Sequence, residues 1–111
     1  MTPNKAIEIV DGLKPNTYSE EDKLRWISDL DGRVKRLVIQ DDEAISYAFP
    51  EDMDKELLIP APFENSYTLY LEAMIDYHNR EYGNYNNSVM MFDAIFTDYK
   101  KDYIRKHRAK G

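Results

Sequence analysis

The stretch that decides the fold is Leu57-Leu58-Ile59-Pro60-Ala61-Pro62-Phe63, together with the aromatic-rich sequence that follows it. Prolines 60 and 62 interrupt any helix in this lead-in. Seven of the nine tyrosines then lie between Tyr67 and Tyr103. Tyrosine combines a large apolar body with a polar tip, so this density is typical of surfaces that are partly core and partly contact. The pattern indicates packing and partners more than catalysis.

Two helices are predicted in this aromatic half. The first runs from about residue 63 to 82 and is stopped by Gly83, because glycine is common just after a helix C-terminus. Residues 84–87 connect it to a second helix that ends near His107, and the two are expected to form an antiparallel hairpin. Their buried stripes are expected to be Tyr67, Leu71, Met74, Ile75, His78 and Tyr82 in the first helix, and Phe92, Ile95, Phe96, Tyr99 and Tyr103 in the second.

Two further helices are predicted in the first forty residues. Apolar residues at helical spacing predict a first, short helix that begins at Pro3 and ends at Gly12. Ser19, followed by three acidic residues, is a typical N-cap for a longer helix that runs to about Gln40. Gly32 inside this helix indicates a close helix crossing, a kink or only a tolerated weak point. The buried stripe of the longer helix is expected to be Leu24, Ile27, Leu30, Val34, Leu37 and Val38, with Trp26 at its edge.

Residues 41–62 lose helical periodicity and contain three prolines, which forbid a continuous helix. The segment fits either a small two-stranded element, pairing residues 47–49 with 57–59, or a packed loop. The predicted fold is therefore all-α: a compact bundle of about four helices with a long irregular loop between the second and third. A chain of 111 residues fits a single domain spanning residues 1–111.

The charge is unevenly distributed along the chain. Residues 100–111 carry six Lys or Arg and one Asp, a net +5, which leaves −11 for the remainder of a chain whose net charge is −6. The acidic body argues against general nucleic-acid binding, whereas the basic end suits an acidic protein face or a phosphate backbone. Residues 104–111 are expected to form a basic, flexible C-terminal tail.

The sequence lacks the residues that several kinds of chemistry require. The absence of cysteine excludes disulfides, thiolate metal sites and a cysteine nucleophile. His78 and Glu81 share a helical face, but the second half of a bundle metal motif is missing. The serines lack a G-x-S-x-G context and no glycine-rich phosphate loop occurs. We therefore expect no enzyme activity, no metal and no cofactor. Without an apolar span or signal peptide, we expect no membrane partner and a protein that stays in the cytoplasm unless it is released by lysis or carried in a particle.

Three motifs carry a family resemblance: the lead-in at residues 57–63, Tyr70-Leu71-Glu72-Ala73-Met74-Ile75-Asp76-Tyr77, and Glu81-Tyr82-Gly83-Asn84-Tyr85-Asn86-Asn87-Ser88. They resemble small proteins encoded in the structural-gene region of tailed phages and prophages of Gram-positive bacteria. The size, the helical order and the early Pro-Asn-Thr-Tyr-Ser turn are similar to head-tail connector proteins, also called head-completion or adaptor proteins. The resemblance covers most of the chain and is strongest from residue 56 to 99.

This resemblance implies a homo-oligomeric ring of about a dozen copies on the portal protein, at the head-tail joint of the virion, after a period in the host cytoplasm during assembly. The ring would extend the channel through which packaged DNA passes without specific binding, and would offer a platform to the stopper or tail-completion protein. The alternatives are another phage neck or tail-completion protein, or a small regulatory protein that binds protein or DNA through its basic tail. The candidate partner contacts are Tyr47, Phe49, Lys100, Lys101, Tyr103, Arg105, Lys106, Arg108 and Lys110.

Overall fold

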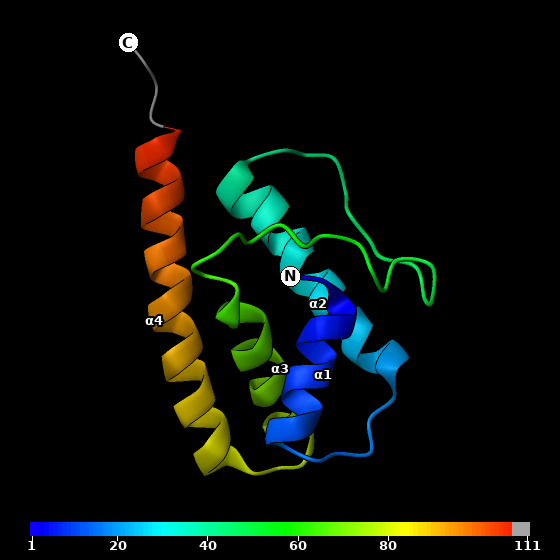
Figure 1. Ribbon diagram of the computed structural model, residues 1–111. Helices are drawn as coiled ribbons and strands as arrows, with labels where there is room; N and C mark the ends of the chain where they lie inside the picture. The colour runs from blue at the N-terminus through cyan, green and yellow to red at the C-terminus, as the bar shows by residue number, and fades with distance from the viewer. Residues whose placement is uncertain (108–111) are drawn as a thin grey trace.

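The computed structural model describes residues 1–107, and within them every regular element is a helix (Figure 1). The elements are α1 (Pro3–Leu13), α2 (Glu20–Arg33), its π-helical continuation η1 (Val34–Ile39), α3 (Asn65–His78) and α4 (Tyr82–Lys106). The predicted all-α bundle of about four helices is thus confirmed. The segment between η1 and α3 forms a long packed loop, and no strand occurs in the described part of the chain.

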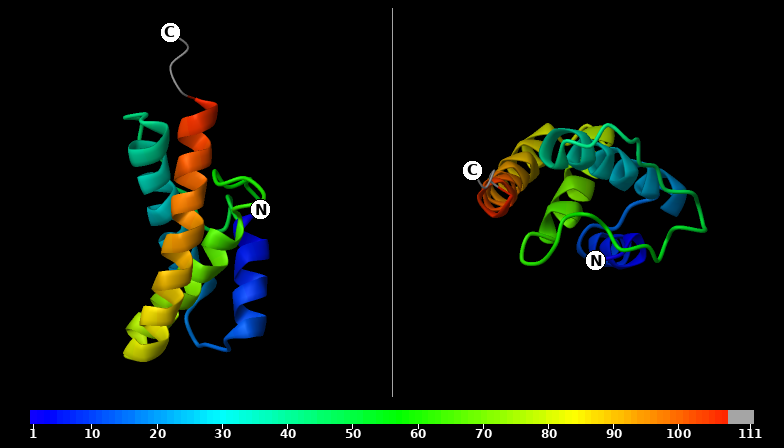
Figure 2. Two further views of the ribbon diagram at one scale, coloured as in Figure 1. Left: turned by 90° about the vertical axis from the view of Figure 1, so that its left-hand side faces the viewer. Right: turned by 90° about the horizontal axis from the view of Figure 1, so that it is seen from above.

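The helices are arranged around α3. On one side α3 packs against the long α4, and on the other it contacts α1 and α2. Figure 1 shows α4 along one edge of the molecule, and the two views of Figure 2 agree that its outer side faces away from the other helices. The core between the helices consists mainly of Ala6, Ile7, Val10, Leu24, Trp26, Ile27, Leu30, Val34, Val38, Tyr67, Leu71, Ile75 and Tyr99.

The start of α2 follows the sequence expectation. The Ser19 hydroxyl accepts a hydrogen bond from the Asp22 N–H at 3.0 Å, which satisfies one of the free donors of the first turn.

Trp26, expected at the edge of the buried stripe, is only 4% exposed. Gly32 marks no helix crossing: a Cβ built there would lie 3.8 Å from the Ile45 carbonyl oxygen, an ordinary contact with the loop.

One member of the expected α2 stripe is wrong. Leu37 is 70% exposed, while Val34 and Val38 are buried as expected. The cause is the π-helical geometry of η1, whose wider turn shifts the direction of successive side chains relative to an α-helix. Leu37 is therefore turned to the surface.

The predicted boundary between the last two helices is also wrong. α3 ends at His78 and α4 begins at Tyr82, so Gly83 lies in the first turn of α4 instead of ending α3. The turn is made by Arg80, which adopts a left-handed conformation with φ of 60°. The Glu81 N–H then donates to the Asp76 carbonyl at 2.9 Å. Tyr82, expected in the buried stripe, is 55% exposed.

The long loop is packed onto the N-terminus of the chain. Met53, Leu57 and Ile59 are buried. The Asn4 N–H donates to the Met53 carbonyl, and the Leu57 N–H donates to the Met1 carbonyl, each at 2.9 Å. These contacts explain how an irregular segment holds a defined shape without strand pairing.

The C-terminal end of α4 lies close to His107, where the sequence predicts the last helix to end. α4 continues through Lys106, so residues 104–106 are helical. The rest of the predicted tail, apart from His107, lies outside the described residues.

Candidate protein-binding surface

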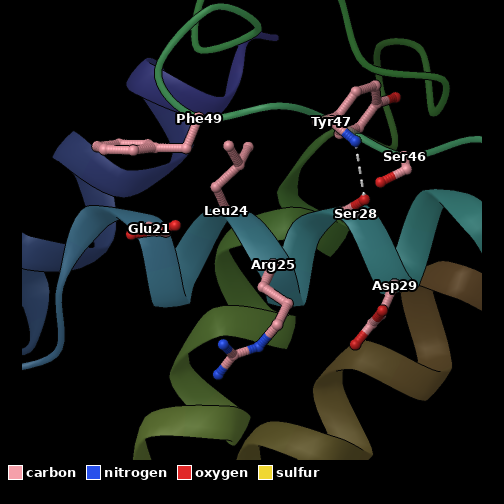
Figure 3. Close-up of a pocket in the computed structure, with 8 residues that line it drawn as sticks. All are labelled: Glu21, Leu24, Arg25, Ser28, Asp29, Ser46, Tyr47 and Phe49. Atoms are coloured by element: carbon pink, nitrogen blue, oxygen red, sulfur yellow. Dashed lines mark hydrogen bonds between the residues drawn. The ribbon is translucent and has the colours of Figure 1, made fainter.

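The two aromatic residues predicted as contacts in the loop have different positions. Tyr47 is only 7% exposed, and its N–H donates to the Ser28 hydroxyl at 3.0 Å (Figure 3). Phe49 is 40% exposed. Together with Leu24 they line a pocket of about 260 Å³ over α2 (Figure 3). Phe49 therefore presents its ring to the surface, whereas Tyr47 mainly anchors the loop.

A buried carboxylate, which the sequence analysis missed, fixes this loop. Asp31 is fully buried and accepts hydrogen bonds from the hydroxyls of Tyr47 and Tyr67, each at 2.5 Å. It also accepts from the Leu58 N–H at 3.1 Å. The Tyr67 hydroxyl in turn accepts from the Ile59 N–H at 2.7 Å. The network joins the loop to α2 and α3 and so holds Phe49 in place.

The electrostatics of this network follow from its burial. Burial raises the pKa of the Asp31 carboxyl above its ordinary value, although the hydrogen bonds from Tyr47, Tyr67 and Leu58 oppose the shift. Burial, followed by the nearby Asp31 carboxylate, also raises the pKa of both tyrosines. The tyrosines therefore stay protonated and act as donors. The network is a structural anchor.

The basic contact residues lie at the C-terminal end of α4. Lys100 and Lys101 are exposed. Asp102 pairs with Arg105, its Oδ1 lying 2.7 Å from an Arg105 guanidinium nitrogen, and with Lys106, whose Nζ lies 3.2 Å from Oδ2. Hydrogen bonds from these two cations lower the pKa of the Asp102 carboxyl. Part of the basic charge is thus neutralised within the helix.

The remaining predicted contacts complete this end of α4. Tyr103 is half-buried, and its ring stacks on the His107 ring with 3.9 Å between centroids. The Lys100 amine lies 5.4 Å from the centroid of the Phe96 ring, within the range of a cation–π contact. Arg108 and Lys110 lie outside the described residues.

A groove that the sequence analysis did not foresee lies between α2, α3 and α4. We call it the aromatic groove; its volume is about 470 Å³. Tyr77, which is 51% exposed, contacts Tyr85 with 5.5 Å between ring centroids, and Tyr70 contacts Phe92 at 5.4 Å. The apolar lining consists of Tyr70, Ala73, Met74, Tyr77, Tyr85, Val89 and Phe92, and the charged lining of Asp29, Arg33 and Asp93.

The aromatic groove escaped prediction for a specific reason. Its residues come from three helices, and the sequence analysis placed Tyr85 in the connection between helices, not in a helix. The density of tyrosines in this half of the chain was the one signal that pointed toward it. Burial raises the pKa of the Tyr70 hydroxyl above its ordinary value, and the Arg33 charge partly offsets this shift.

The lining of this groove includes three tyrosines, a methionine and an arginine. Tyrosine, methionine and arginine are enriched at interfaces, and buried tyrosine and arginine often dominate their binding energy.

Among residues 1–107, no three His, Asp or Glu side chains come together in a way that could hold a metal ion. No described helix is long and apolar enough to span a membrane.

Comparison of the chain with protein-family models, with curated proteins and with solved structures found no match. The structure by itself defines a small all-α protein with a partly exposed aromatic groove. Charge is uneven along the sequence: residues 100–111 carry a net +5 and the remainder carries −11.

Proposed function

We propose that this chain is a non-enzymatic structural protein of a tailed phage or prophage, a head-tail connector adaptor. In this proposal, copies of the chain assemble as a ring on the portal protein, extend the DNA channel and receive the stopper or tail-completion protein. The resemblance of three sequence motifs to connector proteins supports the class, and the all-helical fold agrees with it.

The observation that carries the proposal is the aromatic groove. A large side chain that passes from water into such a groove gains about 1.5–3 kcal/mol on full burial. Tyr77 is half-exposed at this groove, so a partner can bury it further. Arg33 and Asp29 among the lining residues can add polar specificity at the edge of such a contact.

The charge distribution supports the same role. An acidic body repels packaged DNA and so leaves it free to slide, because like charges raise the energy of close approach. The basic end of α4 gives a docking face of opposite sign, which steers association and fixes orientation. Lys100 and Lys101 are the exposed residues that would serve this face.

The proposal is tested by mixing the purified chain with assembled portal rings of the same phage and measuring binding by sedimentation and electron microscopy. We expect one chain per portal subunit. Changing both Tyr77→Ala and Tyr85→Ala is expected to weaken binding at least about tenfold, equivalent to about 1.4 kcal/mol. Leu13→Ala, an exposed apolar residue on α1, is the matched control and should leave binding unchanged.

The two failures of this experiment are distinct. If the unchanged chain does not bind portal rings, the connector function is wrong. If it binds and the groove variant binds equally well, the contact lies elsewhere on the surface.

A further inference from the structure

The long helix α4 packs along one side only. Its 25 residues span about 37 Å at 1.5 Å per residue. Among them only Tyr99 is buried, and the partly buried Phe92, Phe96 and Tyr103 lie on the same side. Figures 1 and 2 show the opposite side turned away from the other helices. Met90, at 70% exposure, and Ile104, at 59%, belong to that free side.

The free side has a regular sequence pattern. Five exposed residues share one line along the helix, directly opposite Tyr99, because they are alternately four and three residues apart. We call them the outer stripe: Met90, Ala94, Thr97, Lys101 and Ile104. Alternating spacings of three and four residues are typical of the seam where two helices pack against each other.

The outer stripe is suited to pairing with itself in the opposite direction. Thr97 stands at its centre, with the apolar Met90 and Ile104 seven residues away on either side. In an antiparallel pair, Met90 of one copy meets Ile104 of the other. The small residues Ala94 and Thr97 near the crossing allow the two helices to approach closely. Lys101 can lie across Ala94 of the other copy with its stem and keep its amine in water.

The charges beside the outer stripe decide the direction of pairing. Asp93 and Lys100 flank it on one side, and Asp98 and Arg105 on the other. An antiparallel pair places Asp93 opposite Lys100 of the second copy, and symmetry makes this attraction twice. A parallel pair would bring Asp93 to Asp98 and Lys100 to Arg105, which are like charges.

One repulsion opposes the antiparallel arrangement. The two Asp98 side chains approach each other near the centre of the pair. This single repulsion is outweighed by the two attractions between Asp93 and Lys100. Removing it with Asp98→Asn should therefore tighten the pair.

We propose that two copies of this chain associate through the outer stripe of α4, packed antiparallel. A symmetric pair of this kind uses the same patch twice and closes at two copies. It is a state of the free protein and does not depend on the connector function, whose ring would need a different, head-to-tail contact. Because the proposed portal contact also uses Lys100 and Lys101, the pair would have to separate before the chain docks on the portal. One helix pair lies at the small end of specific interfaces, which bury roughly 1,200 Å² or more. Association is therefore expected to be weak, and the test is designed around a dissociation constant on the order of 10 µM.

The test is sedimentation equilibrium of the full chain over about two decades of concentration around 10 µM. We expect a reversible monomer–dimer equilibrium. Asp93→Lys and Lys100→Asp, made singly, should each weaken dimerisation about tenfold, because each converts two attractions into two repulsions. The double variant Asp93→Lys with Lys100→Asp should restore it, and Asp98→Asn should tighten it. All these residues are on the exposed surface of α4, so circular dichroism should show unchanged folding.

Two results would overturn the proposal. The first is an unchanged chain that remains monomeric at concentrations more than about tenfold above the expected dissociation constant. The second is a double charge-reversal variant that dimerises as weakly as the single variants, which would mean that Asp93 and Lys100 do not face each other. Leu13→Ala, which removes an exposed side chain of α1, is the control and should leave the equilibrium unchanged.

Discussion

The buried network around Asp31 makes a sharp prediction for the variant Tyr67→Phe. This change removes one hydroxyl that has two tasks: it donates to the Asp31 carboxylate at 2.5 Å and accepts from the Ile59 N–H at 2.7 Å. Tyr67 is fully buried, so water does not replace the lost partner. Phenylalanine keeps the ring, and the packing of the core is otherwise unchanged.

The magnitude follows from these two contacts. Loss of a hydrogen bond to a charged group costs about 1.5–3 kcal/mol, and a buried N–H left without an acceptor costs about 1–3 kcal/mol. Tyr67→Phe is therefore expected to lower the free energy of unfolding by about 3–5 kcal/mol. Tyr47→Phe removes a single donor to Asp31, so its expected cost is smaller, about 1.5–3 kcal/mol.

The assay is urea unfolding followed by far-UV circular dichroism and by the fluorescence of Trp26. With a denaturant slope of about 1–3 kcal/mol/M, Tyr67→Phe should lower the unfolding midpoint by more than about 1 M. Tyr82→Phe is the matched control, because Tyr82 is 55% exposed and its change should stay within about 0.5 kcal/mol. If Tyr67→Phe is no more destabilising than Tyr82→Phe, the network does not hold the loop.

Three further predictions concern charged residues. Burial raises the pKa of folded Asp31 above its ordinary value of 3.8, so the folded state binds that proton more tightly than the unfolded state. The free energy of unfolding of the unchanged chain, measured relative to Asp31→Asn by urea titration, should therefore be greatest below pH 3.8 and fall as the pH rises through the raised pKa. A relative stability that rises with pH would contradict this. Lys14→Met should cost about 3–5 kcal/mol in urea unfolding because it leaves the fully buried Asp76 without its 2.7 Å partner. Lys23→Met should cost less than about 1 kcal/mol, since its partner Asp11 is 43% exposed, and equal costs would argue against this difference. Deleting residues 105–111 should weaken portal binding more than deleting 108–111 alone, because it also removes the cations Arg105 and Lys106; unchanged binding by the longer truncation, measured by co-sedimentation at low salt, would end the proposed role of the basic end.

The sequence predicts the helices of this fold well wherever local rules decide. The Ser19 cap and the apolar spacing of Leu24, Ile27 and Leu30 place α2 correctly, because side-chain periodicity and capping act over a few residues. The boundary between α3 and α4 fails because Arg80 takes a left-handed conformation that glycine usually takes. The neighbouring residues do not predict a left-handed conformation at Arg80, whereas Gly83 is the residue type that usually follows a helix C-terminus.

The surface is harder to predict, since it depends on which helices meet. The residue type of Asp31 predicts a surface position, whereas its place four residues after Ile27 puts it on the buried stripe. That conflict between residue type and position was the available signal. Predicting the aromatic groove would require knowing that Tyr85 is helical and that α4 packs on α3. Both depend on long-range contacts.

Quantitative mass spectrometry of purified phage particles and of tailless heads, in which this chain is counted against the portal protein, tests the connector proposal. The connector proposal predicts near-equal numbers of the two proteins and retention of the chain on tailless heads. Absence of the chain from both kinds of particle would contradict the structural role and favour the regulatory alternative.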